Sequence, residues 1–182
     1  MDRPAWDDVR RDDGGALLRV WFRRLYSEVW GALLRPTWFH TWVEVLARDG
    51  APWHDRPLAV GVYDKMVASQ SRAVLMHQGW EHEPEQLERF DPGYVLVDVP
   101  RFTDAQLDLV NRLCFDGERL DLGPYAFLAA WGPYLAPDES RNCMTWVEEF
   151  IVAAGGRRDV LKRVERGFRE RLTLPESRDR RH

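Results

Sequence analysis

Hydrophobic and polar positions along the chain predict a run of β-strands followed by helices. Strand patterns, rich in β-branched and aromatic residues, occur in four stretches: 37–46, 58–64, 72–77 and 94–99. In the first stretch, strict alternation places His40, Trp42 and Glu44 on one face. The residues between and around them lie on the other face: Phe39, Thr41, Val43 and Val45. We therefore expect a sheet whose first clear strand carries a histidine.

Helical spacing of apolar residues marks the other segments. Residues 16–34 favour a helix, although the segment Leu18–Phe22 also alternates and leaves a strand as the alternative. Thr103 and Gln106 form a capping-box pattern that starts a helix, and Gly117 ends it. Cys114 lies on the apolar face of that helix and is expected in the core. Two more helices are predicted over 143–154 and 160–172.

These elements predict one α+β domain with a central antiparallel sheet of about four to five strands packed against helices. Residues 1–15 have charges without periodicity and are expected to form a loose lead-in. The domain covers 16–172. The charged tail 173–182 is expected to be disordered. We find no repeat and no second domain.

The composition argues against several classes of function. A formal charge of −4 gives no basic footprint, so we expect no nucleic-acid partner. No apolar run approaches the ~20 residues of a membrane span, and the acidic N-terminal residues do not resemble a signal peptide. We therefore expect a cytoplasmic protein, any export using a signal-independent secretion system. Its 2 cysteines, Cys114 and Cys143, fit neither a disulfide framework nor zinc spacing, so no metal or cofactor is expected.

The strongest chemical signal is a cysteine at the predicted start of a helix. Apolar residues follow Cys143 at helical spacing, and Ser140 or Asn142 can cap the first amides. A helix N-terminus with a nearby imidazolium can lower a cysteine pKa from ~8.5 to ~3.5–7.5. Cys143 is therefore the candidate nucleophile, with Asn142 as the cap beside the oxyanion site.

His40 is the candidate base for this thiol. The other histidines are expected to be less suitable: His77 is a reserve candidate, and His54, His82 and His182 are expected in solvated segments. If 37–46 and 58–64 pair as a hairpin with Leu46 near Leu58, Asp64 lies opposite His40 and could orient the imidazole. A register slip of one residue would put Tyr63 or Lys65 there instead.

The order of these motifs resembles the circularly permuted papain-like fold of the lecithin:retinol acyltransferase family and the permuted NlpC-type amidases. The matching stretches are Phe39–Val45, with its histidine, and Asn142–Trp146, with its Asn-Cys pair; Val99–Gln106 resembles the link between them. The resemblance covers roughly residues 37–155 and implies a Cys-His enzyme that forms a thioester. Acyltransferase members carry a second histidine on the neighbouring strand, where this chain has Tyr63 and Asp64.

Three functions follow as hypotheses. The first is a thiol hydrolase that cleaves an amide in a peptide, an isopeptide or a cell-wall stem peptide. The second is an acyltransferase of the same fold, docking on a membrane surface or a partner protein through the Trp-containing residues 17–34. The third is a non-catalytic binding module that uses the 9 tryptophans as recognition surface.

Overall fold

The computed structural model describes residues 6–24, 39–52, 56–126, 140–160, 162–164 and 166, and within them one antiparallel sheet of six strands in the order β5-β1-β2-β3-β4-β6. The strands are β1 (Ala16–Arg24), β2 (Phe39–Val45), β3 (Leu58–Val67), β4 (Gln70–His77), β5 (Gly93–Val99) and β6 (Leu120–Pro124). The helices are η1 (Trp6–Asp8), η2 (Gly79–His82), α1 (Pro84–Phe90), α2 (Asp104–Phe115) and α3 (Cys143–Ala153). The predicted α+β class and antiparallel sheet are confirmed, with more strands than expected.

The first strand corrects the sequence analysis. Residues 16–24 form β1 rather than the start of a helix, and 25–34 lie outside the described residues. β1 pairs along seven residues with β2 and along seven with β5. Its alternate residues Leu18, Val20 and Phe22 are buried in the core. Two neighbouring strands thus satisfy its backbone, and this pairing outweighs the helical spacing of its side chains.

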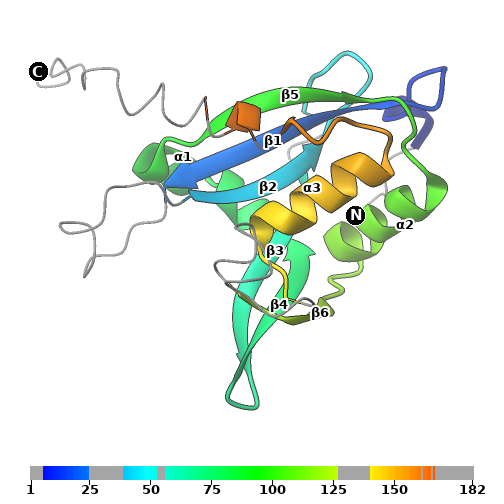
Figure 1. Ribbon diagram of the computed structural model, residues 1–182. Coiled ribbons are helices and arrows are strands. Elements are labelled where there is room, and N and C mark those ends of the chain that lie inside the picture. Colours follow the sequence, from blue (N-terminus) through cyan, green and yellow to red (C-terminus); the bar gives the residue numbers. More distant parts are fainter. Residues whose placement is uncertain are drawn as a thin grey trace, which may run out of the picture.

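Helices α2 and α3 cover one face of the sheet (Figure 1). The core between these layers contains Val43 and Val60 from the sheet and Val147 and Ile151 from α3, all fully buried. Cys114 of α2 is fully buried there as well, as the sequence predicts. The second face of the sheet has a different character, because it carries most of the buried polar side chains.

Helix α2 has the predicted capping box. Thr103 accepts from the amide of Gln106, and the Gln106 side chain accepts from the amide of Thr103. The amide group of Gln106 also donates to the carbonyl of Phe150, 2.9 Å away in α3. One side chain therefore both starts α2 and fixes it against the cysteine helix.

Several connections differ from the expectations. Val9, in the expected lead-in, is fully buried in the core. The segment around His82, expected to be solvated, forms η2 and leads into α1, and its Glu81 is buried. Strand β6 was not predicted. Of the last expected helix, 160–172, only positions 160, 162–164 and 166 are described, and the tail 173–182 lies outside the described residues. Within the described part of the chain, no helix is long and apolar enough to cross a membrane.

Candidate active site

The start of α3 is fixed by its capping residue. The Asn142 side chain accepts hydrogen bonds from the amides of Met144 and Thr145, at 2.9 and 3.0 Å. The Thr145 hydroxyl accepts in return from the amide of Asn142. These bonds satisfy orphan amides of the first turn and make Cys143 the first residue of the helix.

The Cys143 sulfur lies among backbone amides in a closed environment. Hydrogen bonding by the backbone amides of Thr41, Met144 and Cys143 itself acts to lower the pKa of this thiol. Burial nevertheless dominates: it raises the pKa of Cys143 to about 11, although the three amides and the charge of Arg23 lower it. The side chain is only 5% exposed. The expectation that the helix start favours a thiolate is therefore wrong for this structure, where Cys143 is a neutral thiol.

His40 lies on the second face of the sheet. Its Nε2 is 3.4 Å from Oε1 of Gln78 and 3.9 Å from Oε1 of Glu81. The ring stacks on Trp42 and lies against Tyr63, with centroids 5.4 and 4.6 Å away. Burial, followed by the charge of Arg23, lowers the pKa of His40 to about 3. The imidazole is therefore neutral near pH 7.

The two predicted partners approach the same strand from different directions. The backbone amide of Thr41, the residue after His40, lowers the pKa of Cys143, and the charge of Arg23 lowers the pKa of both Cys143 and His40. The hydrogen bond that the His40 ring makes within the described residues goes to Gln78, not to the sulfur. The structure thus brings Cys143 to strand β2 without a direct bond to the imidazole.

Asp64 is not beside His40, which corrects the predicted register by one residue. Val45 rather than Leu46 pairs with Leu58, so the register carries Tyr63 toward His40. The exposed Asp64 instead accepts a hydrogen bond from the Ser71 hydroxyl. A one-residue shift moves a side chain to the opposite face, so Asp64 cannot orient this imidazole.

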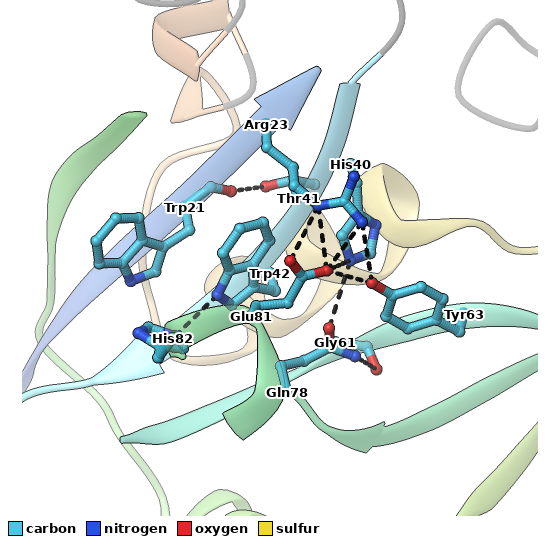
Figure 2. A network of polar contacts seen from close by, with 10 residues as sticks. All are labelled: Trp21, Arg23, His40, Thr41, Trp42, Gly61, Tyr63, Gln78, Glu81 and His82. Atoms are coloured by element: carbon cyan, nitrogen blue, oxygen red, sulfur yellow. Dashed lines mark hydrogen bonds and ion pairs between the residues drawn. The ribbon is translucent and has the colours of Figure 1, made fainter. Parts of the chain in front are cut away.

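The sequence analysis missed three residues that surround His40, namely Arg23, Gln78 and Glu81 (Figure 2). The Arg23 guanidinium donates to both oxygens of Glu81, with distances of 3.0 to 3.2 Å. The Tyr63 hydroxyl also donates to Glu81, and Gln78 is fully buried. Arg23 could have been found by extending the alternation of β1, because it pairs directly with His40. Gln78 and Glu81 had no local signal.

A second polar cluster continues along this face. The Trp21 indole donates to Oε2 of Glu44 at 2.7 Å, and Arg19 donates to the same oxygen at 3.1 Å. The Trp42 indole donates to Nε2 of His82 at 3.1 Å, and burial lowers the pKa of His82 to about 4. His82 is therefore a packed hydrogen-bond acceptor, not the solvated residue that was expected.

His77, the reserve candidate, is engaged away from Cys143. His77 bonds the carbonyl of Pro57 through Nε2 and lies near Arg56. His54 and His182 lie outside the described residues. Among the described residues, no three His, Cys, Asp or Glu side chains are grouped closely enough to hold a metal ion.

The chemistry available here is that of a cysteine at a capped helix start, with backbone amides that lower the pKa of its thiol and a neutral imidazole on the residue before Thr41. Backbone amides at a helix start can stabilise either a thiolate or the oxyanion of an acyl intermediate. Comparison with known proteins gives no family by which to interpret this arrangement: no family model, no curated protein and no solved structure matches the chain.

Proposed function

We propose that this protein is a cysteine-dependent hydrolase of the permuted papain-like type, acting on an amide with Cys143 as the nucleophile and His40 as the base. The observation that carries the proposal is the position of Cys143 as the first residue of a capped helix, where the backbone amides of Thr41, Met144 and Cys143 itself act to lower the pKa of its thiol. Such donors are what an acyl-transfer site needs where negative charge develops.

The reaction starts from a neutral pair. Because the pKa of Cys143 is raised and that of His40 is lowered, the resting state is thiol and imidazole rather than thiolate and imidazolium. His40 takes the thiol proton as sulfur attacks the carbonyl carbon, and the oxyanion accepts hydrogen bonds from the amides at the start of α3. The imidazolium then protonates the leaving amine. Water hydrolyses the thioester, and a proton returns to sulfur.

The proposal requires the imidazole to reach the sulfur when substrate is bound. His40 lies on the second face of the sheet whereas α3 covers the first, so the hydrolase requires a conformational change at β2, where Thr41 adjoins both groups. Peptides, isopeptides and cell-wall stem peptides all present the required amide carbonyl. An amine or alcohol acceptor in place of water would make the same intermediate an acyl-transfer product.

The membrane-docking version of the acyltransferase hypothesis loses part of its basis. Its candidate docking segment was residues 17–34, of which 17–24 belong to strand β1 and 25–34 lie outside the described residues. Trp21 is buried against Trp42 and bonded to Glu44, so it does not present an interfacial surface. We therefore favour the hydrolase.

The test is acylation by p-nitrophenyl acetate, a small activated ester. Wild-type protein is expected to release a burst of p-nitrophenolate and to carry one acetyl group on Cys143, located by peptide mass spectrometry. Cys143→Ala and His40→Ala should lose the burst. Cys114→Ala is the matched control and should keep it, because Cys114 is a core thiol on the other helix. Acetylation that persists in the His40 variant, or that is absent from wild-type protein, refutes the proposal.

A non-catalytic binding module is the second candidate. The observation in its favour is exposed apolar surface on β5, where Tyr94 and Leu96 are about half exposed (50% and 48%) next to Trp21 and Arg19. The same acylation experiment separates the two, since a binding module acquires no acetyl group on Cys143.

A further inference from the structure

The third residue of the site is open once Asp64 is excluded, and the neighbours of His40 supply the candidates. Both oxygens of Glu81 are occupied by Arg23, and Tyr63 donates to the same carboxylate. Its nearest oxygen is 3.9 Å from the imidazole. Glu81 is therefore bonded to Arg23 and Tyr63, and among the described residues Gln78 is the one within hydrogen-bond distance of the ring.

The orientation of the Gln78 amide follows from its second bond. Its Nε2 group donates to the carbonyl of Gly61 at 3.3 Å, because a carbonyl can only accept. Its Oε1 therefore faces His40 Nε2 at 3.4 Å and must accept a hydrogen bond from an N–H at that nitrogen. A neutral imidazole has one N–H, so this bond selects the Nε2–H tautomer and leaves the lone pair on Nδ1.

The surrounding packing holds this amide in place. Gln78 is fully buried, and its backbone N–H donates to the carbonyl of Ala59 at 2.7 Å. Gly61 provides the space: a Cβ there would lie 2.8 Å from Cβ of Trp42 and 3.3 Å from Cδ of Gln78. A buried amide with both ends bonded cannot rotate without losing a hydrogen bond.

We propose that Gln78 is the positioning residue of this site, holding His40 as the Nε2–H tautomer so that Nδ1 is the nitrogen that accepts the Cys143 proton. The role of Nδ1 rests on the proposed hydrolase function, whereas the tautomer does not. Gln78 itself touches neither substrate nor sulfur in this scheme. It acts through the ring, as the orienting member of a catalytic triad does.

The experiment is a long-range ¹H–¹⁵N correlation spectrum of the histidine side chains near pH 7, where both His40 and His82 are neutral. Peaks that disappear in His40→Gln identify His40. Wild-type protein should show the Nε2–H tautomer for His40. His82 is an internal control with the opposite pattern: it accepts from Trp42 on Nε2 and must carry its proton on Nδ1.

Two variants of Gln78 complete the test. Gln78→Leu removes the acceptor, so His40 should lose its fixed tautomer and the acetylation rate of Cys143 should fall on the order of a hundredfold. Gln78→Glu keeps an acceptor oxygen, so the tautomer should remain and the pKa of His40 should rise. If Gln78→Leu does not fold, the rise in the pKa of His40 in Gln78→Glu is the deciding measurement, and a pKa equal to that of wild-type protein overturns the role of Gln78. In both variants the His82 pattern should stay unchanged.

The outcomes separate this inference from the proposed function. The role of Gln78 is overturned, whatever the activity, if His40 of wild-type protein is the Nδ1–H tautomer. It is equally overturned if a folded Gln78→Leu variant shows the same His40 tautomer as wild-type protein. The expected tautomer in a protein that is never acetylated at Cys143 leaves Gln78 as the residue that orients His40 and refutes only the hydrolase.

Discussion

Acid should destabilise this protein in a manner that depends on His40. The imidazole is buried as a neutral group, with its pKa lowered from 6.5 to about 3 by burial and by the charge of Arg23. Between these values the unfolded chain binds a proton that the folded chain does not, so stability is present above pH 6.5 and is lost as pH falls toward 3. Protonation of the His40 ring therefore favours the unfolded state.

The magnitude follows from proton linkage. At about pH 4.5 the solution is two pH units below the ordinary histidine value, and each unit corresponds to about 1.4 kcal/mol. Lowering the pH from about 7 to 4.5 should cost the wild-type protein about 3 kcal/mol through His40. His40→Gln cannot titrate and should lose that part of the pH dependence. The similar contribution of His82 remains in both proteins and cancels from the comparison.

The assay is urea denaturation of both proteins at the two pH values. The expected result is a loss of free energy of unfolding that is about 3 kcal/mol larger for wild type than for His40→Gln. Equal losses would refute the argument. They would mean that the folded protein tolerates the imidazolium, with Glu81 accepting from His40 in place of its bonds to Arg23.

Three further predictions concern the neighbouring groups. Arg23→Met leaves Glu81 buried without its partner cation and should cost roughly 3–5 kcal/mol in urea denaturation, whereas a loss near zero would show that the pair is not buried as described. The rate of Cys143 alkylation by iodoacetamide should rise about tenfold per pH unit up to about 11, the pKa to which burial raises it, and a plateau near neutral pH would contradict this. Asn142→Ala should lower stability by about 1 kcal/mol through loss of the cap, while Asn142→Ser, which keeps a neutral capping oxygen, should lower the temperature of thermal unfolding less.

Local sequence rules predicted the strands and capped helices well where one physical signal dominated. The alternation in 39–45 gave both the strand and the correct division of its faces, because side chains in a strand always alternate. The Thr103–Gln106 capping box gave the start of α2, because the two residues satisfy each other's amides without help from the rest of the chain. For residues 16–24 the preferred sequence prediction was wrong, because both the helical and the strand periodicity fit them. Only pairing with β2 and β5 selects a strand.

The candidate site likewise contains residues that local sequence rules predicted and residues that they did not. The sequence alone indicated Asn142 and Cys143 at a helix start and His40 on a strand, because each depends on residues within one turn or one strand. It could not supply Gln78 or Glu81, which come from the end of β4 and from η2 and meet His40 only after β3 and β4 pair.

The amino-acid sequence determined which residue types stand at each position and which local structures they favour. It thereby determined the α+β class, the capped cysteine helix and the histidine strand. Tertiary structure decided the strand register, the face on which each polar side chain is buried and the protonation of Cys143 and His40. The physical reason is that propensity, capping and alternation act between near neighbours, whereas desolvation and charge depend on segments that are distant in the chain and are brought together by folding.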